Sequence, residues 1–324
     1  MRAIRRIPIL LGVLVAWPIA GRADDPEYPV RPVRIITAGA GTIHDILTRQ
    51  IARELTERWG QSVVVENQPA AAMTVGSRIA ARATPDGYTL LMSDRSALAV
   101  APHLFPKLPY DPTKDFAPIT LVALSPQLLV AHPSVPADSL REFIAYAKQR
   151  PGVINYASAG PGTVMHVAGE MFKQLAGIDL VAVQYKGGAA AMLGMLSSEA
   201  SIGFLSPAVV WPQVAAGKLK AYAITSSKRF SGTPDIPTAI EAGLPGFESE
   251  QWIGMLAPAR TPVPLIARLN RDIVQILNTT AMQSTLRAQG AEPAPGTPAE
   301  FAAFIRSETT KYGKVVQIAG MHVE

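Results

Sequence analysis

The stretch VRIITAGAGTIHDIL, residues 33–47, decides the fold because it leads from a buried strand through a glycine-rich turn into a helix. Its first part, Val33–Ala38, is an unbroken apolar run, as in strands covered on both faces. After the turn, apolar residues recur every four positions and indicate an amphipathic helix: Ile43, Leu47, Ile51 and Leu55. The turn would direct free backbone N–H groups toward an anion, and it consists of Ala38, Gly39, Ala40, Gly41 and Thr42. A tight turn with nothing bound is the alternative.

The same order of strand, small polar turn and helix occurs a second time, after an expected strand over Ile154–Ser158. This second turn contains Ser158, Ala159, Gly160, Gly162 and Thr163, and His166 stands in the helix that follows. Two such turns, in what look like separate α/β domains, suggest two jaws that grip one anion. Other residues at the ends of strands are candidates for the same cleft: Ser93, Arg95, Lys186 and Gly187.

Apolar runs alternate with amphipathic stretches along the rest of the chain, which predicts an α/β architecture with mainly parallel sheets. So many strands fit two smaller sheets better than one large sheet. The expected strands are Val33–Ala38, Val63–Glu66, Thr89–Ser93, Ile119–Ala123, Leu128–His132, Ile154–Ser158, Val181–Tyr185, Ser201–Leu205, Lys220–Thr225 and Trp252–Ala257.

The N-terminus has the three parts of a secretory leader. Basic residues precede an apolar run, Ile7–Ala20, and the small residues Gly21 and Ala23 then suit a signal peptidase. We expect residues 1–23 to be removed near Ala23 and the mature protein to be exported; an uncleaved membrane anchor is the alternative.

Composition narrows the function further. The chain has 324 residues, 48% hydrophobic and 17% charged, which excludes a disordered polyelectrolyte. Without the four Arg of the leader, 26 of the 30 basic residues remain against 25 acidic ones. The mature chain thus lacks the large excess of positive charge that is typical of nucleic-acid-binding proteins. The absence of Cys excludes disulfides and thiol chemistry.

Enzyme signatures are weak. There is no G-x-S-x-G elbow and no phosphate-binding loop with a G-K-[ST] ending. Gly39 and Gly41 imitate a dinucleotide fingerprint in which His44 replaces the third glycine and Glu66 stands for the ribose-binding acid. A Rossmann-like oxidoreductase is therefore kept as an alternative. No pair of His has the spacing of a zinc site, so we expect no metal and no cofactor.

The mature chain resembles the extracytoplasmic solute-binding receptors of tripartite tricarboxylate transporters, the Bordetella uptake gene (Bug, or TctC-like) family. The resemblance covers nearly the whole mature sequence and rests on ordered blocks. Among them are VVVEN from Val63, PDGYTLL from Pro85, LPYDP from Leu108, NYASAG from Asn155, PDIPT from Pro234 and EAGLPG from Glu241.

The resemblance implies a periplasmic binding protein of the type II-like, Venus-flytrap kind: two α/β domains, two crossover segments and no catalysis. We place domain 1 at residues 24–124 plus 247–324 and domain 2 at residues 125–246. The expected ligand is a small dicarboxylate, tricarboxylate or aromatic acid, and the expected partners are the transporter's membrane components. We expect a monomer. A periplasmic sensor that feeds a signalling partner is the alternative to transport.

The sequence departs from the family pattern where a ligand should bind. The family usually has an Asp where Leu205 stands, and small or hydroxyl residues near the positions of His44 and Arg95. Either of these two could bring positive charge into the cleft. One hypothesis is that Arg95 pairs directly with a ligand carboxylate; the alternatives are an outward-pointing Arg95 or a surface pair with Asp94.

Overall fold

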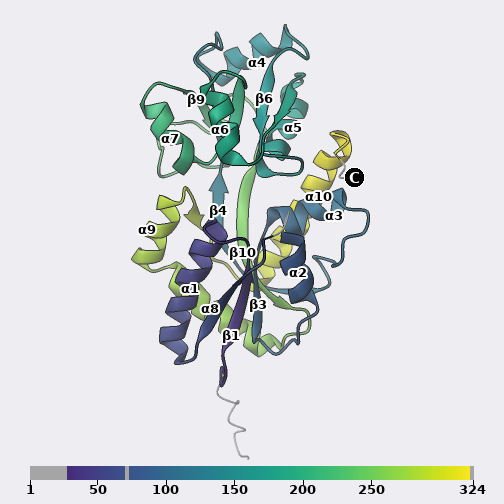
Figure 1. The fold of residues 1–324 in the computed structure, drawn as a ribbon, viewed down its shortest axis with the longest axis vertical. Coiled ribbons are helices and arrows are strands. Elements are labelled where there is room, and N and C mark those ends of the chain that lie inside the picture. Colours follow the sequence, from purple (N-terminus) through teal and green to yellow (C-terminus); the bar gives the residue numbers. More distant parts are fainter. Residues whose placement is uncertain (1–27, 70–72, 322–324) are drawn as a thin grey trace, which may run out of the picture.

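A computed structural model describes residues 28–69 and 73–321, and it contains two α/β domains arranged end to end (Figure 1). The expected leader and its cleavage point near Ala23 lie outside these residues. Across the described part of the chain, no helix has both the length and the apolar character to cross a membrane.

Domain 1 is built on a six-stranded sheet with the strand order β11-β4-β10-β3-β1-β2. Its strands are β1 (Val33–Thr37), β2 (Val63–Asn67), β3 (Thr89–Asp94), β4 (Phe116–Pro126), β10 (Glu250–Pro258) and β11 (Glu292–Pro293). Its helical segments are α1 (Ile43–Trp59), α2 (Thr74–Ala81), the π-helical η2 (Ser96–Val100), α3 (Ala101–Leu104), α8 (Val263–Leu277), α9 (Thr280–Ala288) and α10 (Pro298–Ile318).

Domain 2 is built on a five-stranded sheet with the strand order β7-β6-β8-β5-β9. Its strands are β5 (Leu128–Ala131), β6 (Asn155–Ser158), β7 (Val181–Gln184), β8 (Ile202–Leu205) and β9 (Lys220–Ile224). Its helices are α4 (Leu140–Lys148), α5 (Val164–Ala176), α6 (Gly188–Leu196) and α7 (Pro207–Ala215).

Each expected strand is present, and the prediction of two α/β domains is confirmed. The prediction of mainly parallel sheets is wrong, because both sheets are mixed. In domain 1, β10 runs antiparallel to β3 and β4, and in domain 2, β5 runs antiparallel to β8 and β9. Burial on both faces makes any strand apolar, so composition does not reveal its direction. The residue limits of the two domains stay a prediction.

Two segments carry the chain between the domains, one from β4 into β5 and one from β9 into β10 (Figure 1). Hydrogen bonds tie them together where they cross. The Thr225 hydroxyl donates to the Ser249 carbonyl (2.6 Å) and accepts from the Gln127 N–H (2.8 Å). Further backbone bonds join Thr225 to the same two residues. The crossing point is therefore one bonded unit.

One hydrophobic core runs through the crossing point into both domains. It joins Leu91 and Trp252 of the first sheet to Phe172 and Phe204 of domain 2. Phe247, on the segment that leads into β10, packs against Phe172 and Phe204 with ring centroids 5.6 and 5.8 Å away. The two sheets are thus linked by packing as well as by the chain.

We predict that Gly254→Ala lowers the free energy of unfolding by about 1–3 kcal/mol, as overpacked core substitutions do. Gly254 lies in β10, and a Cβ there would come within 2.0 Å of Phe301 Cζ. Gly188→Ala is the matched control, because its Cβ would enter open space. Denaturant unfolding measures both variants; equal stability of the two would contradict this account of the core.

Candidate functional site

The two glycine-rich turns have the same internal geometry. In the β1–α1 turn, the Thr42 hydroxyl donates to the Gly39 carbonyl (2.8 Å), and Thr42 caps α1. In the β6–α5 turn, the Thr163 hydroxyl donates to the Gly160 carbonyl (2.7 Å), and Thr163 caps α5. Each turn therefore places the N-terminus of a helix, with its partial positive charge, at the end of a central strand.

The turns differ in the side chain that accepts a hydrogen bond from the second glycine. The Gly41 N–H donates to Asp45 Oδ2 (3.0 Å), whereas the Gly162 N–H donates to His166 Nδ1 (3.2 Å). Burial lowers the pKa of His166, so this ring is neutral near pH 7. The chain's own carboxylate thus offsets the positive end of α1, while the positive end of α5 keeps its full field.

Asp45 is held in its charged form. Burial alone would raise the pKa of Asp45, but bonds from Asn67, from the Gly41 N–H and from Arg49 lower it. The domain 1 turn keeps two N–H groups, those of Gly39 and Ala40, for which the described residues supply no acceptor. This turn can therefore still donate to a ligand, but with less electrostatic attraction than the other.

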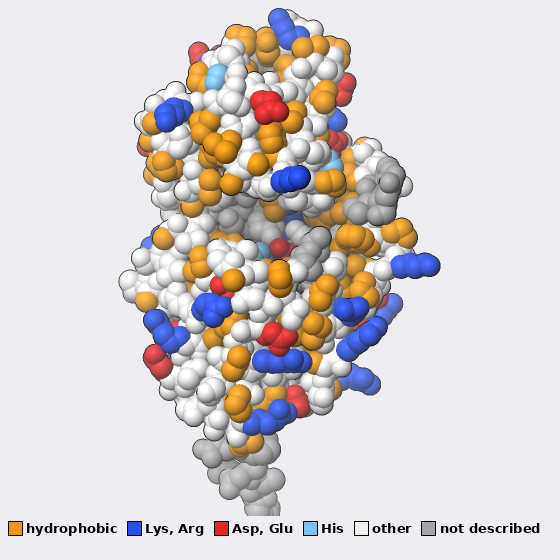
Figure 2. Space-filling model, viewed as in Figure 1, with side chains coloured by type: hydrophobic (Ala, Val, Ile, Leu, Met, Phe, Trp, Pro, Cys, Tyr) orange, Lys and Arg blue, Asp and Glu red, His pale blue; other side chains and the backbone are white. Residues whose placement is uncertain are grey.

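Figure 2 shows the surface hollowed between the two domains, with histidine and acidic side chains visible at its floor. The carboxyl ends of β1 and β6, where the turns begin, face each other there (Figure 1). Beside the domain 2 turn, the domains touch: a Cβ at Gly162 would lie 2.5 Å from Leu104 Cδ1. Gly162 also has a φ of +72°. A glycine is thus required where domain 1 meets this turn.

At the floor of domain 1, β3 ends in a polar cluster. His44 Nε2 lies 3.1 Å from Asp94 Oδ2, a close polar contact without the alignment of a hydrogen bond. Gln251 Nε2 donates to the same oxygen (2.7 Å), and the Ala97 N–H donates to Oδ1 (3.1 Å). Sequence reasoning noted His44 as a possible charge but missed its partner, because the residues come from different elements.

Arg95 does not face the cleft. Its side chain is fully buried, and Nη1 donates to the Glu250 carbonyl (2.9 Å), the Tyr312 hydroxyl (3.0 Å) and Ser249 Oγ (3.3 Å). The geometry therefore does not support an ion pair between Arg95 and a ligand carboxylate. The two alternatives, an outward-pointing Arg95 and a surface pair with Asp94, are wrong. Arg95 instead fastens the end of β3 to the start of β10 and to α10.

The other sequence candidates divide into two groups. Thr163 lies in the domain 2 turn, Ser158 is the buried last residue of β6 before that turn, and Lys186 and Gly187 lie at the start of α6, with Lys186 exposed. In contrast, Leu205 is buried in the domain 2 core and Ser93 is buried in β3. A leucine at the end of a buried strand packs inward, so Leu205 contributes to the core rather than to the cleft.

The features of a dinucleotide site are not assembled. Glu66, the residue in the place of a ribose-binding acid, pairs with Arg34 Nη1 (3.1 Å) and accepts from Gln68 (2.8 Å). The ring of His44, in the place of the third glycine, points to Asp94. The oxidoreductase alternative therefore finds no support in the geometry.

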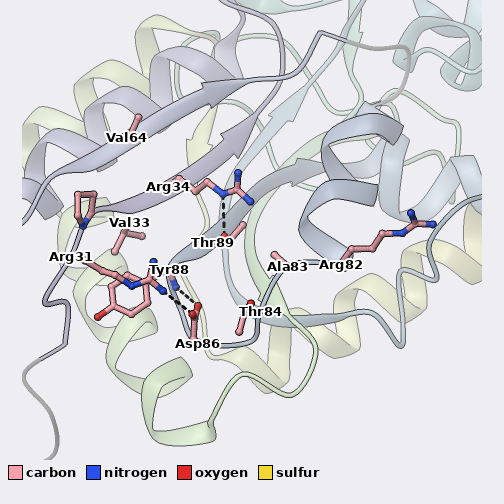
Figure 3. Close-up of a pocket in the computed structure, with 11 residues that line it drawn as sticks. Arg31, Val33, Arg34, Val64, Arg82, Ala83, Thr84, Asp86, Tyr88 and Thr89 are labelled. Atoms are coloured by element: carbon pink, nitrogen blue, oxygen red, sulfur yellow. Dashed lines mark hydrogen bonds and ion pairs between the residues drawn. The ribbon is translucent and has the colours of Figure 1, made fainter.

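A separate cavity of about 390 Å³ lies at the opposite end of domain 1, where β1 and β3 begin (Figure 3). Arg31 in its wall pairs with Asp86 (2.9 Å), and Arg34 donates to Thr89 (3.1 Å). These arginines already have partners within the chain, and the cavity is remote from both turns. The hollow between the domains is the better candidate site.

We predict that Arg95→Ala lowers the free energy of unfolding by about 3 kcal/mol, because it removes three bonds from a buried charged donor. Thermal and denaturant unfolding measure the effect. Arg287→Ala, at an exposed position of α9, should stay within about 0.5 kcal/mol of wild type. A normal melting temperature together with lost ligand affinity would instead assign Arg95 to the ligand.

Glu250, at the start of β10, predicts a pH dependence of stability. Burial raises its pKa to about 7 despite the attraction of Lys311. An unfolded Glu titrates near pH 4.3, so the folded state binds the extra proton and stability falls as pH rises from about 4.5 to 7. Glu250→Gln should therefore raise the melting temperature by about 2 °C near pH 8.

The same substitution should have little effect near pH 4.5, where both states hold the proton. Glu57→Gln, at an exposed position of α1, is the control and should be neutral at both pH values. An effect of Glu250→Gln that does not change with pH would contradict the titration.

Comparisons with known proteins agree with this geometry. The description "Tripartite tricarboxylate transporter family receptor" belongs to the family model that matches residues 47–321. Protein BugT of Bordetella pertussis is 34% identical over 97% of this chain and 98% of its own length.

Two solved structures extend the comparison. R. palustris Rpa4515 with adipate is 30% identical, covers 91% of this chain and 100% of its own, and has a TM-score of 0.78. MatC from Rhodopseudomonas palustris with bound malate is 33% identical, covers 89% and 100%, and has a TM-score of 0.74. The chain therefore belongs to the tripartite tricarboxylate transporter receptor family, whose members are solute-binding receptors rather than enzymes.

Proposed function

We propose that this protein is an extracytoplasmic receptor that captures a small carboxylate between its domains and delivers it to the membrane components of a tripartite tricarboxylate transporter. The observation that carries the proposal is the pair of equivalent turns, at Gly39–Thr42 and Gly160–Thr163, on facing ends of the two domains. The relatives solved with adipate and malate, both dicarboxylates, support this ligand class.

The two turns supply what a carboxylate needs. Helix N-termini offer N–H groups and a favourable field, and a carboxylate that accepts several such bonds is held without a full counter-charge. Because the Gly162 N–H at the α5 end donates to the neutral ring of His166 rather than to a carboxylate, the first carboxylate binds at the domain 2 turn. Closure of the domains then brings the Gly39–Thr42 turn onto the other end of the ligand.

The cellular location and the processing of the chain are part of the same proposal. We propose that the chain is exported, that residues 1–23 are removed near Ala23, and that the monomer works in the periplasm. Only the closed, loaded form presents surfaces from both domains side by side. That composite surface would let the membrane components distinguish loaded from empty receptor.

We predict that a small di- or tricarboxylate raises the melting temperature of purified, ligand-stripped protein. A ligand at about 100 times its dissociation constant adds about 2.7 kcal/mol, or roughly 2 °C or more for a chain of this size. The panel should hold adipate, malate, citrate, aromatic acids and their amides. No shift with any acid, from folded protein, would reject the proposed ligand class.

Gly162→Ala tests whether the domain 2 turn belongs to the site, because its Cβ would lie 2.5 Å from Leu104 Cδ1 and force a shift where the turn meets domain 1. Gly217→Ala is the matched control: it has a similar φ of +69° but no atom within 4 Å of the added Cβ. Both should lose some stability from the strained φ. Only Gly162→Ala should also weaken carboxylate binding in calorimetry, and equal affinity of the two would contradict the placement.

A further inference from the structure

The pair of His44 and Asp94 at the floor of domain 1 is a feature that the glycine-rich turns do not explain. Asp94 is buried, with 5% of its surface exposed, at the carboxyl end of β3. His44 is the second residue of α1, directly after the Gly39–Thr42 turn, and 8% of it is exposed. A buried polar pair at this position has a cost in desolvation, which points to a role beyond packing.

The charge state of the pair follows from its surroundings. Burial alone would raise the pKa of Asp94, but the contact with His44, the Ala97 N–H and the nearby Arg95 lower it. Asp94 is therefore an anion inside the protein. Hydrogen bonds commit Arg95 Nη1 to Ser249, Glu250 and Tyr312, so the basic side chain in direct contact with Asp94 is His44.

The orientation of the ring leaves one nitrogen for a ligand. Nε2 is buried against Asp94, whereas Nδ1 has no partner among the described residues and is not among their buried unsatisfied atoms. Nδ1 therefore remains open to the solvent side of the ring. Gln251 Nε2 donates to the same Asp94 oxygen that Nε2 of His44 contacts, and Gln251 Oε1 is buried with no partner in the described chain. A bound donor group or water would satisfy this oxygen.

The domain 1 turn has few donors left for an anionic ligand. Its Gly41 N–H is already taken by Asp45, and the negative charge of Asp45 opposes the approach of an anion. The Gly39 and Ala40 N–H groups alone face that repulsion. A second ligand carboxylate at this turn therefore needs a further donor. Arg49 is already paired with Asp45, whereas the ring of His44, directly after the turn, keeps Nδ1 without a partner in the described chain.

Resting on the proposed function, we propose that His44, held by Asp94, binds the second carboxylate of a dicarboxylate ligand through Nδ1 and so selects dicarboxylates over monocarboxylates. The carboxylate lies on the opposite side of the ring from Asp94, so the ring separates the two carboxylates. The other charges around the ring are Arg95 at the end of β3 and Asp45 on α1, the latter paired with Arg49 (2.9 Å). Gln251, from β10, is uncharged.

The experiment compares adipate with hexanoate, which has the same chain length but one carboxylate, by titration calorimetry. Wild type should bind adipate more tightly, and His44→Gln should lose about 10- to 100-fold affinity for adipate, as expected for a charge-assisted bond. Its affinity for hexanoate should change by less than about two-fold. His132→Gln, in a domain 2 loop where the ring contacts Ser134, is the matched control and should leave both affinities unchanged.

Wild type alone provides a second readout that does not depend on the folding of any variant. Its affinity for adipate should fall as pH rises, because the proposed contact needs a proton on both ring nitrogens. Its affinity for hexanoate, and the affinity of His44→Gln for adipate, should change little.

The outcomes separate the two proposals. Equal losses for adipate and hexanoate in His44→Gln, or a flat pH profile in wild type, would overturn the role of His44. Binding of hexanoate without adipate or malate would also overturn it and leave the receptor function standing. Binding of no carboxylate at all by folded wild type would overturn both.

Discussion

The antiparallel pairing of β4 with β10 is the constraint on which the rest of the structure depends. The two strands pair from Phe116 with Pro258 to Pro126 with Glu250, inside the sheet of domain 1, and each continues into the other domain. Since both crossings start from one strand pair, and Thr225 bonds them together, the domains share a single pivot. Arg95 bonds the cleft end of β3 to β10 at this pivot, so the cleft floor and the crossing segments are directly connected.

Sequence patterns predicted the local elements well because they depend on local chemistry. The apolar runs at Val33 and Val63 and the four-residue repeat from Ile43 placed strands and helices within a few residues. Strand direction could not be predicted. The chain passes through the whole of domain 2 before β10 joins the domain 1 sheet, and the residues around Trp252 carry no signal of that direction. The short strand β11 has only two residues and leaves no periodic signal.

The site shows the same division between local and distant information. Both turns were visible as glycine-rich junctions before helices, and their caps at Thr42 and Thr163 follow from the same local rule. The burial of Arg95 and the contact of His44 with Asp94 depend on residues from α1, β3, β10 and α10 meeting in space. The presence of a charged residue in the sequence therefore did not predict whether its side chain faces the cleft, the core or the crossing segments.

The core that passes through the crossing point has a consequence for how the protein unfolds. Phe247 packs on domain 2 rings, while Trp252, five residues further along the same segment, packs edge-on against Phe301 of α10 (5.9 Å). Loosening either domain exposes part of this shared cluster, whereas the separate clusters around Leu47 and Ile273 in domain 1 and around Val130 and Met195 in domain 2 each stay within one domain.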